Sequence, residues 1–226
     1  MTRIRNEAVN ESESNSDSQV RDIYIYSSIE NSDFDFDGSM SARKLIDSLG
    51  DLKNLSQIIL HINSEGGALF EGVTIYNLLK DSGVEVHAII EGLCASSASV
   101  IAMSASKIIM KRGSVFMIHK PVTFATGTSE ELNKCAEALN MITENIIDIY
   151  QARTGLSRET INDLMSKESF MSGEMAKSLG FCDEYENEEI QPAKPEENQE
   201  NQEDNQDDEP ERIDNIFKRQ ILNFLP

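Results

Sequence analysis

One stretch of the chain, residues 84–103, changes from the pattern of a strand to that of a helix, and it constrains the fold most. Its first half is apolar and rich in Val and Ile, and Gly92 is followed by a run of small residues that ends at Met103. A strand that turns sharply into a small-residue helix is typical of a helix packed closely on a sheet. We therefore expect the chain to turn at Gly92, with Ser96 at that turn.

The same order of strand, glycine turn and helix occurs just before this stretch. Residues 57–63 have a strand pattern, Gly66 and Gly67 form a turn, and apolar residues at helical spacing continue to Leu79. Repeated strand–helix units need crossovers on a sheet face, so the sequence predicts an α/β domain with parallel strands. Further strands are expected at 22–27, 107–110 and 114–121. Further helices are expected at 42–49, with Ser41 as its cap, after Ser157, which is placed to start one, and after Ser172, which is placed to cap one.

A long helix is predicted over residues 129–153. Thr128 and Glu131 match a capping box at its start, and Gly155 is placed to end it. At about 1.5 Å per residue, such a helix would be roughly 37 Å long. A domain of this size does not need that length to cover its own core. We therefore expect part of the helix to project towards a neighbouring subunit.

Composition divides the chain into four parts. Residues 1–20 are polar and are expected to form a flexible arm, and residues 21–185 hold the folded domain. Residues 186–211 contain twelve Asp or Glu against a single Lys, which predicts a disordered acidic linker. Residues 212–226 place apolar side chains at helical spacing. They predict a short amphipathic helix that becomes ordered on docking to a partner.

Charge and cysteine content exclude several classes of function. The formal net charge of −20 argues against nucleic acid and anionic membranes as partners, because both would be repelled. Three cysteines, without Cys-x-x-Cys spacing or a His/Cys cluster suited to zinc, predict reduced thiols and no zinc site. No apolar run approaches the roughly 20 residues of a membrane span. With no signal-peptide pattern at the start, we expect a cytoplasmic protein.

Ser96 has the sequence context of a nucleophile. A hydroxyl at a sharp strand–helix corner lies near the free N–H groups of the helix start, which favour negative charge. A small-residue helix packed on a sheet explains the same pattern. Of the three histidines, His61 and His87 lie inside predicted apolar strands, whereas His119 ends one. Catalytic side chains reach a cleft from strand ends, so His119 is favoured as a base.

Gly66 and Gly67 are candidates for an oxyanion hole. Glycine lets the backbone approach a substrate carbonyl, and the helix that follows leaves its first N–H groups free. An ordinary turn explains the pair equally well. No acid is selected as the orienter of His119, because the chain holds forty Asp and Glu and their spacing does not distinguish them.

Four segments, taken together, resemble the successive motifs of the Clp protease proteolytic subunit family. They occur in that family's order and at similar separations, and the resemblance extends from about Ile23 to Glu184. The segments are Ile-Asn-Ser-Glu-Gly-Gly at 62–67, Gly-Leu-Cys-Ala-Ser at 92–96, Met-Ile-His-Lys-Pro at 117–121, and Glu-Ser-Phe-Met-Ser at 168–172 followed by Ala176, Gly180, Phe181 and Asp183.

The resemblance implies a Clp/crotonase-type spiral of ββα units and a Ser-His-acid serine endopeptidase. It implies a homo-oligomer of stacked rings that encloses the active sites and acts on polypeptide substrates. The implied catalytic residues are Ser96 as nucleophile, His119 as base and Glu168 as the acid, and a peptidase of this kind is expected to need no metal and no cofactor. The N–H groups of Gly67 and Ser97 would form the oxyanion hole, with Gly66 beside it, and extended substrate would lie along Gly67–Leu69 and residues 120–123.

Several positions depart from the housekeeping members of that family. Glu168 stands where they have Asp, Glu65 where they have Pro, and Ser97 where they usually have Met. The segment 35–52 is shorter than the apolar helix and loop of subunits that dock to unfoldases. These features resemble the phage branch, the capsid-maturation or prohead proteases, and imply capsid or scaffold proteins as partners.

Other functions stay open on the sequence. A housekeeping Clp subunit would work with an ATPase unfoldase. A related spiral fold serves crotonase-like acyl-CoA enzymes, which also use glycine N–H donors, but Ser96 and His119 would then have no role. An inactive scaffold that kept the fold is the remaining alternative.

Overall fold

The computed structural model describes residues 19–31, 38–53 and 55–186. The predicted acidic linker and terminal helix lie outside the described residues, as does the predicted arm up to residue 18. The described elements are β1 (Gln19–Ile25), α1 (Ala42–Leu49), β2 (Leu55–Ser64), α2 (Leu69–Asp81), β3 (Glu85–Ala95), α3 (Ser97–Ala102), β4 (Lys107–Met110), β5 (Val115–Ile118), α4 (Ser129–Thr154), α5 (Arg158–Ser166), β6 (Ser169–Met171), α6 (Gly173–Ser178) and β7 (Glu184–Tyr185).

The described strands form one sheet, which confirms the predicted α/β class. Its order is β1-β2-β3-β4-β7, and β5 pairs with β3 while β6 pairs with β5. Every pair is parallel except β5–β6. The chain passes through α4 and α5 after β5, and β6 then runs antiparallel to β5. β1 begins at Gln19, so the predicted arm gives its last two residues to the sheet.

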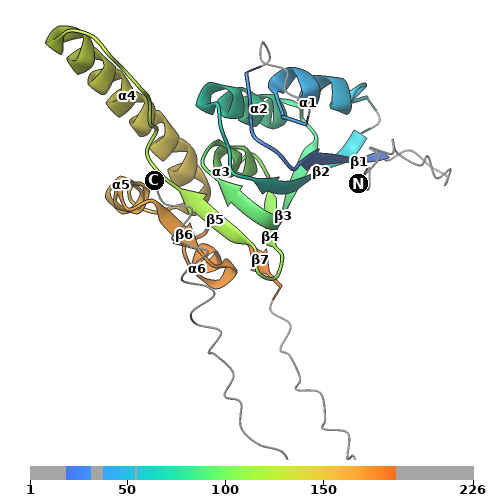
Figure 1. The fold of residues 1–226 in the computed structure, drawn as a ribbon. Helices are drawn as coiled ribbons and strands as arrows, with labels where there is room; N and C mark the ends of the chain where they lie inside the picture. The colour runs from blue at the N-terminus through green and yellow to red at the C-terminus, as the bar shows by residue number, and fades with distance from the viewer. Residues whose placement is uncertain (1–18, 32–37, 54, 187–226) are drawn as a thin grey trace, which may run out of the picture. The chain divides into compact units, whose positions relative to one another are not determined.

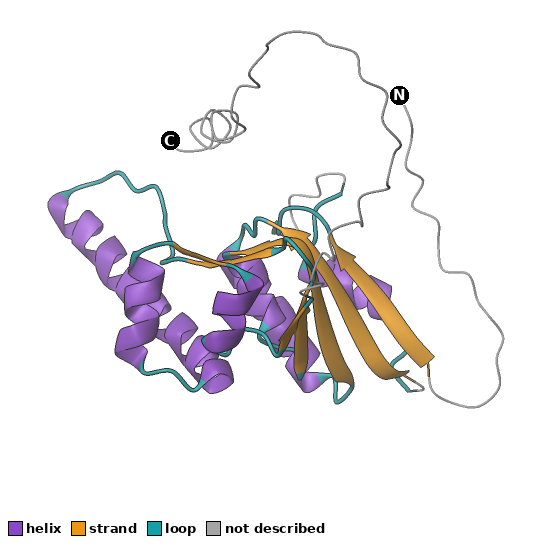
Figure 2. Ribbon diagram, turned by 90° about the horizontal axis from the view of Figure 1, so that it is seen from below, coloured by secondary structure: helices purple, strands orange, loops and turns teal. Residues whose placement is uncertain are grey.

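Helices α1, α2 and α3 lie on one face of the sheet (Figures 1 and 2). The period of two in β1 explains this arrangement, since Ile23 and Ile25 are buried under the helices while Tyr24 is exposed on the other face. α1 begins at the Ser41 cap, whose side chain accepts a hydrogen bond from Lys44 N. The core therefore lies between the helices and one face of the sheet.

β3 is the strand on which the site is built. Its first half pairs with β4, as far as Ile90 opposite Met110, and its second half pairs with β5, from Leu93 opposite Val115. The prediction that the chain turns at Gly92 is wrong, because the strand continues to Ala95. Gly92 is needed for close approach instead. A Cβ at Gly92 would overlap the Asn63 side chain, whose Oδ1 accepts a hydrogen bond from Leu93 N at 3.0 Å.

The long helix α4 is confirmed at 26 residues, with the predicted capping box at Thr128 and Glu131. Gly155 ends it in the left-handed conformation, with φ of 72°. Only its C-terminal half is buried in the domain, and its N-terminal half extends away from the sheet (Figure 1). Leu132 and Met141 are 42% and 62% exposed on that projecting part. A contact with a neighbouring subunit stays a prediction.

The chain after α4 holds two strands that the sequence did not predict. The caps at Ser157 and Ser172 are confirmed, since each side chain accepts a hydrogen bond from the backbone three residues on. β6 and β7 have three and two residues, too few to show a period of two. Among the described helices, none is long and apolar enough to cross a membrane.

Candidate active site

Ser96 lies at the corner between β3 and α3 in a strained backbone conformation. Its φ of 54° and ψ of −126° fall where a residue with a Cβ is uncommon. The strain is held by the main chain: Ser96 N donates to Met117 O at 3.1 Å, and Ser96 O accepts from Ser99 N at 3.0 Å and Val100 N at 3.3 Å. The sharp corner therefore lies at Ser96 itself, four residues later than predicted from Gly92.

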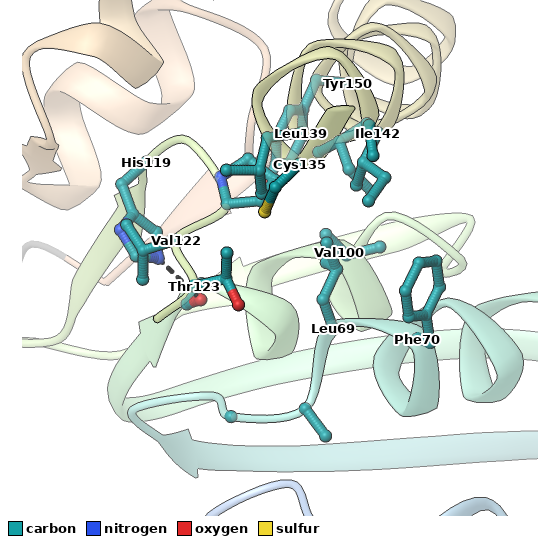
Figure 3. A pocket seen from close by; sticks show the side chains of 16 residues that line it. Leu69, Phe70, Val100, His119, Val122, Thr123, Cys135, Leu139, Ile142 and Tyr150 are labelled. Carbon is teal, nitrogen blue, oxygen red and sulfur yellow. Dashed lines mark hydrogen bonds between the residues drawn. The ribbon is translucent and has the colours of Figure 1, made fainter. Parts of the chain in front are cut away.

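His119 comes to Ser96 through strand pairing. Ala95 of β3 lies opposite Met117 of β5, so the residues just beyond each strand end are neighbours. The His119 Nε2 to Ser96 Oγ distance is 2.8 Å (dashed line in Figure 3). When the serine hydroxyl donates in this bond, the proton of the neutral imidazole is on Nδ1. The arrangement is that of a hydroxyl nucleophile beside its base.

The other two histidines belong to the surface of the sheet. The ring of His61 bonds to Asp22 at 3.1 Å and to Glu91 at 2.9 Å. It also stacks on the ring of Tyr24, with centroids 4.6 Å apart. His87 Nε2 bonds to Glu85 at 2.9 Å. These contacts explain both residues as surface side chains paired with carboxylates.

Glu168 lies in the turn before β6, close in register to His119. Ile118 of β5 is opposite Ser169 of β6, so His119 and Glu168 are the next positions along the two strands. The Glu168 side chain is exposed, and its φ is 48°. Among the described residues, the His119 ring bonds to Ser96 alone and no hydrogen bond joins it to the Glu168 carboxylate. The fold brings the predicted acid beside the base without linking the two.

The glycine pair lies beside the corner at Ser96, with Gly66 packed directly against it and Gly67 packed against the Ile29 backbone. Both have positive φ, 92° and 145°, which favours glycine. A Cβ at Gly66 would lie 2.6 Å from Ala95 O, 2.8 Å from Ser96 Cβ and 2.9 Å from Ser97 N. Within the described chain, the N–H groups of Gly67 and Ser97 have no hydrogen-bond partner. These two free donors belong to the residue after Ser96 and to the glycine turn beside it, where the oxyanion hole is predicted.

Ser64 holds this glycine turn in place, and sequence reasoning did not identify it. Its hydroxyl donates to Ser27 O at 2.5 Å and accepts from Gly66 N at 3.1 Å, and the residue is 1% exposed. The second bond is a local serine–backbone turn. A serine two residues before Gly66 is a signal for such a turn, but the bond to Ser27 depends on the tertiary fold.

A cavity of about 450 Å³ opens beside Ser96 and His119. Leu69 and Phe70 of α2 face Leu139, Ile142 and Tyr150 of α4 across it (Figure 3). The segments predicted to hold extended substrate were Gly67–Leu69 and residues 120–123. All of these residues except Lys120 line the cavity and form two further sides. The α4 wall was not predicted as part of the site, because the sequence explains its apolar spacing as helix packing alone.

Cys94 does not compete with Ser96 as a nucleophile. The residue is fully buried in β3, and burial raises the pKa of its thiol well above the ordinary value. A protonated, inaccessible thiol is a poor nucleophile. Cys135 lines the cavity from α4 and is half-buried.

Comparisons with known proteins give the family of this chain and a structure with the same fold. The family described as Clp protease matches residues 17–189. The chain is 34% identical over 130 residues to an ATP-dependent Clp protease proteolytic subunit of Ligilactobacillus salivarius, covering 56% of this chain and 65% of the relative. It is 33% identical over 129 residues to the subunit named likewise in Pleurastrum terricola, covering 56% and 66%. The chain thus spans slightly less than two thirds of these relatives' length.

One solved structure, a ClpP1 mutant from Listeria monocytogenes, has the same fold. It matches with a TM-score of 0.61 at 24% identity, over 74% of this chain and 92% of that one. The family match spans most of the chain and includes both Ser96 and His119. This chain belongs to the Clp protease family.

Proposed function

We propose that this chain is a serine endopeptidase with Ser96 as nucleophile and His119 as general base. The observation that carries the proposal is the 2.8 Å contact between Ser96 Oγ and His119 Nε2 at a strained corner with two free N–H donors beside it. An acyl-CoA enzyme that uses only the glycine donors would not need this pair. Backbone strain held by many bonds is typical of a functional site.

The geometry supports the usual steps of acyl transfer. Ser96 Oγ attacks the peptide carbonyl carbon while His119 Nε2 takes the hydroxyl proton. The carbonyl oxygen becomes negatively charged and accepts hydrogen bonds from the N–H groups of Gly67 and Ser97. His119 then gives the proton to the leaving amine, and the C–N bond breaks. Water, activated by His119, releases the acyl group from Ser96.

Glu168 is proposed as the residue that orients His119. It occupies the position next to His119 in the β5–β6 register. A carboxylate near Nδ1 would hold the required tautomer and stabilise the imidazolium formed during attack. The side chain must turn from its exposed position towards the ring to do so. Exposed side chains change rotamer on the nanosecond timescale or faster, so this rearrangement would be fast.

The substrate proposed for this site is an extended polypeptide with an apolar side chain before the scissile bond. The cavity walls are formed mostly by aliphatic and aromatic side chains, including Leu69, Val100 and Ile146. A volume of about 450 Å³ accommodates a large apolar side chain, and a charged one would be desolvated without a partner. We therefore expect peptides with Leu, Met or Phe at this position to be cleaved faster than peptides with Asp.

A fluorophosphonate probe tests the proposal directly. An activated serine reacts covalently with the probe, so peptide mapping should find the label on Ser96 in the wild-type chain and none in Ser96→Ala. An acyl-CoA enzyme or an inactive scaffold would leave Ser96 unlabelled. Cleavage of fluorogenic peptides by the same samples should be lost in both Ser96→Ala and His119→Ala.

We further propose that the active form is a homo-oligomeric ring. The proposed location of this ring is the cytoplasm. The projecting half of α4 exposes Leu132 and Met141, which is unusual for a helix that serves only its own domain. Light scattering should show an oligomer for the wild-type chain. Leu132→Asp combined with Met141→Asp should yield smaller species, and neither residue lines the cavity. An unchanged size would remove α4 from the assembly interface.

The biological setting has two candidate forms. Head maturation in a phage or prophage, with capsid or scaffold proteins as partners, is supported by Glu65, Ser97 and Glu168, which differ from housekeeping subunits. Work with an ATPase unfoldase is favoured by the names of the relatives, which are ATP-dependent Clp protease proteolytic subunits. The neighbouring genes distinguish the two: portal and major capsid genes support the first form, and an unfoldase gene supports the second.

A further inference from the structure

A buried hydroxyl pair links the cavity wall to the backbone of Ser96. Tyr150 of α4 and Ser99 of α3 lie 2.7 Å apart, oxygen to oxygen, and the two residues are 1% and 0% exposed. Ser99 Oγ also lies 2.5 Å from Ser96 O. No pattern in the sequence indicates this contact, because 51 positions separate the two hydroxyl residues.

The direction of the hydrogen bonds is fixed by proton count. Ser99 has one hydroxyl proton, and it is donated to the carbonyl oxygen of Ser96, which has no proton of its own. Tyr150 must then donate to Ser99 Oγ. Burial raises the pKa of the Tyr150 hydroxyl well above its ordinary value, so the tyrosine stays protonated and stays a donor. The chain of donors runs from Tyr150 to Ser99 to Ser96.

The carbonyl at the end of this chain belongs to the strained residue. Ser96 O accepts from Ser99 N, Val100 N and Ser99 Oγ, and of these three bonds only the last depends on side chains. A residue held at positive φ keeps that conformation only while its surroundings fix it. A small rotation of the Ser96 peptide would move its Oγ away from His119 Nε2, and a misplacement of about 1 Å can cost roughly a hundredfold in rate.

We propose that Tyr150 is a positioning residue that acts through Ser99 to hold the Ser96 backbone in its reactive conformation. The inference rests on the proposed peptidase function. The ring of Tyr150 lines the cavity while its hydroxyl supports the nucleophile, so one side chain connects the substrate-side wall to the reacting residue. Its ring is fixed in turn by an edge contact with Phe181, with centroids 5.7 Å apart.

Tyr150→Phe tests the inference because it removes the hydroxyl and keeps the ring. We expect kcat to fall about tenfold, with KM within about twofold of wild type, since the lost bond acts on the nucleophile and not on substrate. The rate of fluorophosphonate labelling at Ser96 should fall by the same factor. Ser99→Ala should slow both rates at least as much, and the double variant should be no slower than Ser99→Ala, because the two hydroxyls act in series.

Thr143→Val is the matched control. Thr143 is a buried hydroxyl on the same helix, bonded to Leu139 O at 2.8 Å, and it does not line the cavity. Thr143→Val should lower thermal stability to a degree similar to Tyr150→Phe, while leaving kcat and the labelling rate of Ser96 unchanged. The inference is overturned if Tyr150→Phe matches wild type in both rates, if it matches the control, or if KM rises with kcat unchanged. If the wild-type chain is not labelled at Ser96, the proposed function itself fails.

Discussion

Two residues with a Cβ have positive φ in the described chain, Ser96 at 54° and Glu168 at 48°, and they differ in how they are held. Ser96 is surrounded by buried residues and its peptide takes part in bonds to β5 and α3. Glu168 is exposed, and its backbone N–H bonds only to Met165 O at 3.2 Å. Similar strain is therefore fixed in one place and weakly supported in the other.

This difference separates the two halves of the proposed triad. The nucleophile and base are joined by a 2.8 Å contact within one chain, so this half is pre-organised. The acid lies next to the base in register but keeps its carboxylate in solvent. Residues that share a proton transfer need fixed geometry, whereas an orienting carboxylate contributes through its charge once it turns to the ring.

The largest effect is expected for Ser96→Ala, which removes the fixed half of the triad. Peptide turnover should fall at least about a thousandfold, because every productive path begins at this oxygen, while the melting temperature stays within a few degrees. Steady-state peptide cleavage and thermal unfolding on the same sample provide the measurement. More than about a hundredth of wild-type turnover would mean that another residue is the nucleophile.

Glu168→Gln tests the loosely held half. We expect turnover to fall about a hundredfold or more, since an amide cannot stabilise the imidazolium of His119. The labelling rate of Ser96 should fall with it, and the melting temperature should not change, because the side chain is exposed. Turnover close to that of wild type would show that Ser96 and His119 work as a dyad without Glu168. The contacts among the described residues join only these two.

Gly66→Ala tests how closely the turn must pack on the corner at Ser96. The new Cβ would lie 2.6 Å from Ala95 O at a φ of 92°, so we expect about 3 kcal/mol less stability and at least tenfold slower labelling. Gly113→Ala is the matched control, since it has a φ of 77° with nothing within 4 Å. That variant should lose only about 1 kcal/mol and label normally. Equal effects in the two variants would contradict a role for close packing.

The smallest change in stability is expected for Glu168→Gly, which is a test of backbone strain and not of activity. Glycine adopts positive φ without strain, so relief of about 1 kcal/mol of strain should exceed the roughly 0.5 kcal/mol cost of added chain entropy and raise stability by about 0.5 kcal/mol. Glu174→Gly in the first turn of α6 is the comparison, and it should lose about 1 kcal/mol. Urea unfolding measures both. A loss of stability in Glu168→Gly would show that the Glu168 side chain makes a stabilising contact.

Local patterns in the sequence determined most of the secondary structure and two of the site residues. Caps at Ser41, Thr128, Ser157 and Ser172 were predicted because each depends on residues within four positions of the cap. The family's order of motifs indicated Ser96, His119 and the glycine pair, and the structure brings these together. The fold class followed from the repeated strand–helix pattern.

Only the tertiary structure decided how these parts meet. The strand continues through Gly92 because Asn63, on the neighbouring strand, occupies the space that a side chain would fill. The bond from Ser64 to Ser27 joins residues 37 positions apart, and the link from Tyr150 to Ser99 joins residues 51 positions apart. The α4 wall of the cavity faces residues of α2 that are still farther away in the sequence. Such contacts depend on how elements pack in three dimensions, and periodicity within one element carries no information about its partner. The position of the Glu168 carboxylate is undetermined by sequence for the same reason, since its motif fixes the residue's register beside His119 but not its rotamer.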